Sequence, residues 1–192
     1  MTGITLEKLR QQLTHRQPAR VLEPFDAQAA VALVVVPSYG GDLELLFIRR
    51  AEKLGDPWSG HIALPGGRRN QQDPDLRDTA IRETREETGV ELSDHAFLAD
   101  LDEVRPRTPS LPPIVIRPHL FGLPNRPTLK PSYEVADTRW ISLKTLRDSQ
   151  AETTVEVRGS SLVVPAFLVG PVVIWGLTER IVKGFLDLID LP

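Results

Sequence analysis

The stretch PGGRRNQQDPDLRDTAIRETREETGV, residues 65–90, joins a Pro-Gly-Gly turn to the clearest helix signal of the chain. We expect the helix over residues 74–88, with Asp73 as its N-cap and Pro74 in its first turn. Gly89 then takes the left-handed conformation that ends many helices. The stretch therefore predicts a glycine-rich loop followed by a helix of about four turns.

Three glutamates gather near the end of this helix. Glu83, Glu86 and Glu87 stand at i, i+3 and i+4, so their side chains converge on one face and their charges repel. They also lie where the helix dipole favours cations over anions. A solvated charged face, neutralised in part by Arg82 and Arg85, is the alternative interpretation. The unfavourable placement favours a function for the three carboxylates.

A divalent cation would account for these carboxylates. Mg²⁺ prefers oxygen ligands and is usually held by a few carboxylates together with water and substrate phosphate. The Pro-Gly-Gly turn can bring a backbone carbonyl, of Gly66 or Gly67, close to the same ion. Arg82 stands one turn before Glu86 and can orient it through a charge-assisted hydrogen bond. The residues alone thus indicate a hard-metal site.

The rest of the chain alternates strand and helix patterns. Residues 5–13 carry leucines at helical spacing behind Thr5, and residues 30–37 form an apolar, β-branched run typical of a central strand. A Gly-Gly turn leads to a second strand at 43–50, which predicts a hairpin. Further elements are expected as strands at 95–104, 114–122 and 136–141, helical turns at 142–150, a hairpin over 153–169 and an amphipathic helix over 175–189. The pattern predicts one α/β domain in which helices cover a mixed sheet.

Composition narrows the class of protein. The chain has 192 residues, of which 41% are hydrophobic and 26% charged, as in ordinary globular domains. It has no cysteine, which excludes disulfides, thiolate nucleophiles and Cys-ligated metals. Its net charge of −3 argues against sequence-tolerant nucleic-acid binding. Neither a signal-peptide pattern nor an apolar run of about 18 residues is present, so we expect a cytoplasmic protein without a nucleic-acid or membrane partner.

The stretch 65–90 resembles the signature of the Nudix hydrolases, G-x5-E-x7-R-E-U-x-E-E-x-G-U, where U is apolar. In the second half, Thr84 replaces the apolar U, and the residues that match in register are Arg82, Glu83, Glu86, Glu87, Gly89 and Val90. In the first half, one extra residue separates Gly67 from Arg82, and the glutamate of the pattern is missing, with Asp73 and Pro74 at the nearest positions. The resemblance implies an α/β/α sandwich with a mixed sheet and a loop-helix-loop catalytic motif. It also implies that Mg²⁺ or Mn²⁺ promotes attack by water on a diphosphate linkage.

Three stretches resemble the coenzyme A pyrophosphatase branch of this family. They are LLFIRRAEKLGDPWSGHIALPGG (45–67), SYEVADTRWISLKTL (132–146) and VVIWGLTERIV (172–182). The stretch 45–67 differs from the branch at residues 56–61, which read DPWSGH. It also differs at Leu54 and Gly55, where the branch usually has an arginine. The resemblance implies a Nudix domain over residues 25–192, preceded by an N-terminal helix and linker at 1–24. The implied substrate is coenzyme A or a derivative, cleaved to 3′,5′-ADP and a 4′-phosphopantetheine.

The resemblance also implies roles for particular residues. Glu83, Glu86, Glu87 and the carbonyl of Gly66 would hold the metal, and Arg82 would orient Glu86. Glu86 and Glu87 are in addition candidates for a catalytic role in taking the proton of the attacking water.

Other candidates lie outside the helix. Glu134, in a proline-bounded loop, is a candidate for the general base, and Glu103 competes with it. Candidates for substrate binding, listed together, are Arg49, Arg50 and Arg68 as phosphate-binding cations and Trp58, which either stacks on an adenine or packs as a loop anchor.

The leading hypothesis is a metal-dependent pyrophosphohydrolase that acts on a small-molecule diphosphate, as a monomer or homodimer. Its first rival is a Nudix hydrolase of nucleoside diphosphate derivatives or (d)NTPs. A catalytically silent nucleotide-binding module is a further alternative, and a structural α/β protein with a charged helix is the last. The intact R-E-x-x-E-E pattern speaks against the silent module, which gains nothing from three mutually repelling glutamates.

Overall fold

The computed structural model describes residues 4–55, 58–106, 113–157 and 159–190. Its helices and strands follow the chain in the order α1 (Leu6–Leu13), β1 (Ala27–Pro37), β2 (Leu43–Arg50), β3 (Ile62–Ala63), β4 (Gly66–Arg68), α2 (Leu76–Thr88), η1 (Asp94–Ala96), β5 (Phe97–Asp100), β6 (Ile114–Gly122), β7 (Val135–Ser142), α3 (Leu143–Asp148), β8 (Gln150–Val157), β9 (Ser160–Val169), β10 (Val172–Trp175) and α4 (Gly176–Ile189).

Strand β1 lies at the centre of a seven-stranded mixed sheet. The strand order is β3-β2-β1-β6-β5, with β4 also paired to β1 and β7 to β2. β1 is antiparallel to β2, with Val35 opposite Leu45. It is parallel to β6 from Ala27 to Val35. The predicted central strand and the predicted hairpin are both confirmed.

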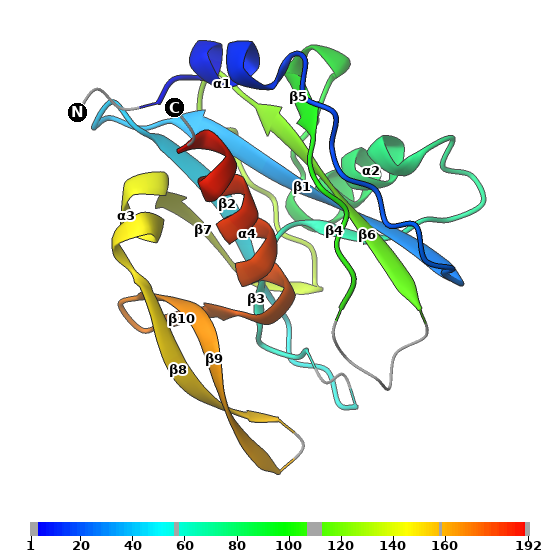
Figure 1. The fold of residues 1–192 in the computed structure, drawn as a ribbon, viewed down its shortest axis with the longest axis vertical. Coiled ribbons are helices and arrows are strands. Elements are labelled where there is room, and N and C mark those ends of the chain that lie inside the picture. Colours follow the sequence, from blue (N-terminus) through cyan, green and yellow to red (C-terminus); the bar gives the residue numbers. More distant parts are fainter. Residues whose placement is uncertain (1–3, 56–57, 107–112, 158, 191–192) are drawn as a thin grey trace.

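Helices cover both faces of this sheet (Figure 1). Leu76 and Ala80 of α2 pack with Ala30 of β1 in one buried cluster. Phe185 of α4 and Leu33 of β1 belong to a second cluster on the opposite face. Because alternate residues of a strand point to opposite faces, β1 supplies both clusters. The predicted α/β/α sandwich is confirmed.

A second, antiparallel sheet has the strand order β10-β9-β8. β8 and β9 pair without a break from Gln150 opposite Phe167 to Val157 opposite Ser160. Figure 1 shows this two-stranded ribbon extending beyond the body of the molecule. Phe167, at the base of the ribbon, is buried in the same cluster as α4. The hairpin predicted over 153–169 is confirmed, and its first strand begins earlier than predicted, at Gln150.

The start of α2 and the extent of β5 differ from the prediction. α2 begins at Leu76, and its N-cap is Asp75, whose side chain accepts two backbone N–H groups of the first turn. The prediction that Asp73 caps the helix is wrong, because its carboxylate is hydrogen-bonded to Arg82 instead. The strand predicted at 95–104 is a 3-10 turn followed by the shorter β5.

The segment that precedes β1 is tied to the loop that follows β5. Arg16 forms an ion pair of 2.6 Å with Asp102, and Arg20 forms one of 2.7 Å with Asp100. Leu9 of α1 is buried in the cluster that also contains α4. The proposed boundary between residues 24 and 25 stays a prediction. In the part of the chain that the structure describes, no helix has the length and apolar character needed to cross a membrane.

Candidate active site

The guanidinium of Arg82 is held in place by Asp73. Nε and Nη2 of Arg82 each donate a hydrogen bond of 2.9 Å to a different carboxylate oxygen of Asp73. Asp73 is only 6% exposed and also accepts from the Thr79 hydroxyl and the Asn70 amide. The hydrogen bonds from Arg82 hold the pKa of Asp73 well below its usual value. Asp73 is therefore a charged, fully engaged partner of Arg82.

The third nitrogen of the same guanidinium reaches two of the clustered glutamates. Nη1 of Arg82 lies 2.9 Å from Oε1 of Glu83 and 3.1 Å from Oε2 of Glu86. Glu86 is exposed, whereas Glu83 is half-buried, and this burial raises the pKa of Glu83. One arginine, locked by Asp73, thus sets the positions of two glutamates on the same face of α2.

Glu87 is the most buried of the three glutamates. Its side chain is 6% exposed, and Oε2 accepts the backbone N–H of Gly66 at 2.9 Å. Burial raises the pKa of Glu87 to about 8; the hydrogen bond from Gly66 opposes this shift, and the charges of Glu83 and Glu134 add to it. The positive charge of Arg50 also acts on Glu87, in the lowering direction. A carboxylate in this environment gains most from a nearby cation.

The two glycines of the turn leave room for these carboxylates. A Cβ at position 67 would lie 2.3 Å from Oε1 of Glu83, so any side chain there would displace the glutamate. Gly66 has φ 157° and lies against β1, where a Cβ would meet the Ala30 carbonyl oxygen at 2.3 Å. Glycine is therefore required at position 66 for β4 to approach β1 so closely, and glycine at position 67 leaves Glu83 in its place.

The loop that carries Glu134 is tied to the end of α2 by main-chain hydrogen bonds. The amide of Lys130 donates to the Thr88 carbonyl at 2.7 Å, and the amide of Ser132 donates to the Glu87 carbonyl at 3.0 Å. The carbonyl of Glu134 in turn accepts the amide of Ala51, at the end of β2, at 2.8 Å. These contacts place exposed Glu134 beside Glu87, although the two residues lie far apart in the sequence.

Glu103, the competing candidate, is engaged elsewhere. Its carboxylate accepts two hydrogen bonds from Arg117, of 2.9 and 2.6 Å, and one from the Val21 amide at 2.9 Å. The side chain is only 4% exposed. Through these hydrogen bonds Glu103 ties the segment before β1 to strand β6. The assignment of Glu134 as the general base stays a prediction.

The predicted substrate-binding residues are dispersed. Arg49 and Arg50 are neighbours at the end of β2, where the pairing with β7 shifts register. Arg49 is exposed and Arg50 is half-buried, and the charge of Arg50 acts on Glu87. Trp58 is 40% exposed and adjoins residues 56–57, which lie outside the described part of the chain. Arg68 is exposed, and its carbonyl accepts a hydrogen bond from Arg82. The structure thus brings Arg50, and the main chain of Arg68, next to the glutamates.

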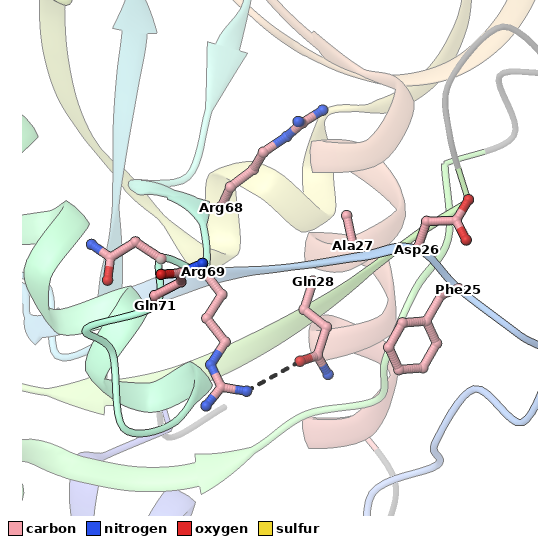
Figure 2. Close-up of a pocket in the computed structure, with 8 residues that line it drawn as sticks. Phe25, Asp26, Ala27, Gln28, Arg68, Arg69 and Gln71 are labelled. Atoms are coloured by element: carbon pink, nitrogen blue, oxygen red, sulfur yellow. Dashed lines mark hydrogen bonds between the residues drawn. The ribbon is translucent and has the colours of Figure 1, made fainter.

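A hollow of about 510 Å³ lies where β1 begins and β4 ends. Figure 2 shows Arg69 and Gln28 pointing toward each other across it, while Arg68 points away from both. Arg69 also donates to the carbonyls of Asp73 and Pro74, which fixes the loop before α2. The hollow therefore lies beside the loop that supports the glutamates.

The donor set fits a hard divalent cation. Carboxylates and a glycine-rich turn converge, and Gly67 leaves space for Glu83. Among the described residues, the hydrogen-bond partner of buried Glu87 is the uncharged main-chain N–H of Gly66. Oxygen ligands of this kind suit Mg²⁺ or Mn²⁺. Within the described ranges, no three acidic or histidine side chains already stand in the arrangement of a metal cluster. Glu83 and Glu86 point instead to Arg82, and Glu87 to Gly66.

Fold and site together define a hydrolase of the pyrophosphatase type, and comparison with known proteins identifies the family. The NUDIX domain model matches residues 27–160, which cover the sheet, α2 and the Glu134 loop. The chain belongs to the Nudix family. Members of this family generally act with divalent metal ions.

Similar proteins agree with this assignment. The mitochondrial coenzyme A diphosphatase NUDT8 of Mus musculus is 31% identical over 178 residues, which are 89% of this chain and 83% of that protein. An uncharacterised protein of Schizosaccharomyces pombe is 36% identical over 121 residues; the match covers 60% of this chain but only 37% of that longer protein. A MutT/nudix family protein from Enterococcus faecalis has a similar fold, with a TM-score of 0.61, 18% identity and coverage of 97% of this chain and 70% of that one.

Sequence reasoning missed the partner of Arg82. The family signature has its glutamate eight positions before the arginine, where this chain has Pro74. Asp73 stands one position earlier, and its carboxylate accepts two hydrogen bonds from the guanidinium of Arg82. The signal was present as a carboxylate next to the expected position.

Proposed function

We propose that this Nudix hydrolase cleaves the diphosphate linkage of coenzyme A or its derivatives. The observation that carries the proposal is the match to a coenzyme A diphosphatase along 89% of the chain, well beyond the signature helix. The site geometry supports the same reaction class, because buried carboxylates and an arginine converge beside the glycine turn.

In this proposal Glu83, Glu86, Glu87 and the carbonyl of Gly66 hold Mg²⁺ or Mn²⁺. When bound, the ion neutralises diphosphate charge and lowers the pKa of a coordinated water. Arg82 keeps Glu83 and Glu86 on one face of the helix, and Asp73 keeps Arg82 in its plane. Glu134 accepts the proton of the attacking water, a role that its place beside Glu87 supports.

In this proposal the arginines near the site have different roles in substrate binding. Arg50 faces the carboxylates and contacts a substrate phosphate, where its planar guanidinium can bind two oxygens. Arg49 and Arg68 are exposed and supply charge at the edges of the site, and Trp58 lines its entrance. The products are 3′,5′-ADP and a 4′-phosphopantetheine.

A screen of phosphate-containing products tests the proposal. The panel contains coenzyme A, acyl-CoAs, dephospho-CoA, ADP-ribose, NADH, diadenosine polyphosphates and (d)NTPs, each with and without Mg²⁺ or Mn²⁺. Metal-dependent release of 3′,5′-ADP from coenzyme A, with the highest kcat/KM of the panel, is the expected result. Inactivity on every compound would overturn the enzymatic function and favour a binding module.

A nucleoside diphosphate derivative is the second candidate substrate. The departure of residues 54–61 from the coenzyme A branch favours it, since these residues include Trp58, a candidate for stacking on an adenine. A higher kcat/KM for ADP-ribose or a (d)NTP than for coenzyme A would select this alternative.

The cytoplasmic location stays a prediction; the mouse relative is named as mitochondrial.

A further inference from the structure

The loop between β4 and α2, residues 69–75, buries little surface. All of its residues are exposed except Asp73, which is 6% exposed. A segment with so few buried contacts depends on hydrogen bonds to keep one conformation. This loop carries the carboxylate that orients Arg82. The hydrogen bonds that hold the loop therefore also bear on the orientation of Arg82.

The side chain of Arg69 supplies hydrogen bonds of this kind. Its Nη2 donates to the Pro74 carbonyl at 2.7 Å. Nε and Nη2 also donate to the Asp73 carbonyl, at 3.3 and 3.2 Å. A planar guanidinium can bind several oxygens in this way, whereas an ammonium group is a point charge. One side chain thus binds both carbonyls that flank the ring of Pro74.

Arg69 is itself anchored to β1 through Gln28. The amide of Arg69 donates to the Gln28 carbonyl at 3.0 Å, and Nη1 donates to Oε1 of Gln28 at 3.3 Å. Figure 2 shows the two side chains pointing toward each other. Gln28 belongs to the central strand of the large sheet and stands opposite Val115 of β6. The sheet therefore gives Arg69 a fixed point of attachment.

We propose that Arg69 is a positioning residue for the metal site and acts through Asp73 and Arg82. The hydrogen bonds run from Arg69 to the main chain of Asp73, and from Arg82 to the carboxylate of Asp73. Arg82 in turn donates to Glu83 and Glu86, two of the proposed metal ligands. This inference rests on the proposed function, in which these glutamates hold a divalent cation.

The sign of the expected effect separates positioning from simple electrostatics. Arg69 carries a positive charge, and removing a positive charge near a cation site should by itself strengthen metal binding. Loss of the positioning role has the opposite effect. When the Asp73 carboxylate is held less firmly, Arg82 can turn toward the glutamates and compete with the metal. Weaker metal binding in a variant without Arg69 therefore indicates positioning.

Isothermal titration of the full chain with Mg²⁺ and Mn²⁺, without substrate, measures this effect. Arg69→Gln should weaken the binding of both ions by about threefold or more. The matched control is Arg85→Gln, because Arg85 is an exposed arginine of α2 next to Glu86 and its replacement removes the same charge. This control should not weaken binding. Wild-type affinity in Arg69→Gln would overturn the proposal, as would equal weakening by the two variants.

A double variant tests whether Arg69 acts through Asp73. Two residues of one hydrogen-bonded network give non-additive changes in free energy, whereas independent residues give additive ones. Asp73→Asn combined with Arg69→Gln should therefore bind Mg²⁺ about as tightly as Asp73→Asn alone. An Arg69→Gln effect of full size in the Asp73→Asn background would overturn the route through Asp73.

Exchange of the Arg82 Nε–H with water provides a readout that needs no metal. This group donates to the Asp73 carboxylate at 2.9 Å. Its NMR signal, assigned by its loss in Arg82→Lys, should exchange about threefold faster or more in Arg69→Gln. Arg85→Gln should match the wild type. Unchanged exchange in Arg69→Gln would overturn the proposal.

Thermal unfolding shows whether each variant is folded. Arg69→Lys keeps the charge but lacks the planar fork, so it should also weaken metal binding, and it replaces Arg69→Gln if the latter unfolds early. A wild type that binds neither ion would overturn the proposed metal site, and the Nε–H exchange would then still decide whether Arg69 positions Arg82. Failure of the proposed function and failure of this inference thus give different results.

Discussion

Arg82 binds Asp73 through two parallel hydrogen bonds of 2.9 Å, across a separation of nine residues. A planar guanidinium bound at two points cannot rotate, and its remaining nitrogen is directed at Glu83 and Glu86. A residue outside the helix thus controls the orientation of two proposed metal ligands inside it. Residues that orient metal ligands typically affect metal affinity strongly.

Asp73→Asn should weaken the binding of Mg²⁺ and Mn²⁺ about tenfold or more. The amide removes the negative charge and one acceptor, so Arg82 is freer to pair with Glu83 and Glu86 and compete with the metal. Isothermal titration with each ion measures the effect. Asp75→Asn is the matched control, because asparagine still caps α2. Wild-type metal affinity in Asp73→Asn would contradict the assigned role.

Glu87→Gln should lower kcat by at least about 100-fold while leaving the fold intact. In the metal-free protein the variant should also be more stable than the wild type at pH 8 or above, because it no longer buries a carboxylate charge. Steady-state kinetics and thermal unfolding without metal test the two parts. Hydrolysis at the wild-type rate with saturating Mg²⁺ would show that Glu87 is not a metal ligand.

Gly67→Ala should reduce metal affinity through Glu83. The new methyl group would lie 2.3 Å from a carboxylate oxygen, so the glutamate must move from its place beside Arg82. Gly184→Ala in α4 is the control, because its new methyl group meets no atom within 4 Å. This control should stabilise the protein by about 0.5–1 kcal/mol. Equal metal affinity in Gly67→Ala and the wild type would show that the close approach of Gly67 to the Glu83 carboxylate does not matter for metal binding.

Glu134→Gln and Glu103→Gln should have opposite effects. Glu134 is exposed beside the site, so its replacement should lower kcat, with little change in the melting temperature. Glu103 is buried against Arg117, so its replacement should lower the melting temperature with little change in kcat. Kinetics and thermal unfolding on both variants decide between them. A loss of kcat confined to Glu103→Gln would reverse the assignment.

Asp100 should make stability depend on pH in the acid range. The hydrogen bond with His119, at 2.9 Å, and then the ion pair with Arg20 lower the pKa of Asp100 to about 2. The folded state therefore favours the charged form, and this stabilisation is complete above the unfolded pKa near 4 and is lost as the pH falls toward 2. Allowing for partial exposure, it amounts to about 1–2 kcal/mol.

Urea unfolding of Asp100→Asn and of the wild type tests this dependence. The wild type should be more stable by that amount at pH 7, and the difference should shrink to about half by pH 3. A difference that stays constant between these pH values would show that Asp100 acts without its charge.

The local parts of the site could be predicted from the sequence. Glu83, Glu86 and Glu87 share a face because helical spacing alone places them there, and Gly89 ends the helix as its type favours. The start of the helix was harder, because Asp73 and Asp75 are both suitable N-cap residues and flank a proline. Arg82 decides between them, because it binds the carboxylate of Asp73 and Asp75 then caps the helix.

The long-range parts could not be predicted. The environment of Glu87 depends on Arg50 and Glu134, which approach it from β2 and from the loop before β7. The structural role of Glu103 depends on Arg117 and on a segment more than eighty residues earlier in the chain. Pairings between distant strands and loops carry no local periodicity, so the sequence pattern does not reveal them.

The loop that presents Glu134 is tied to α2 and β2 by main-chain groups, through the amides of Lys130 and Ser132 and the carbonyl of Glu134. Main-chain hydrogen bonds form whatever side chains the loop carries, proline excepted at the donor positions. The loop can therefore change in sequence during evolution while position 134 keeps its place beside Glu87. Such an arrangement lets substrate preference diverge among relatives without rebuilding the catalytic centre.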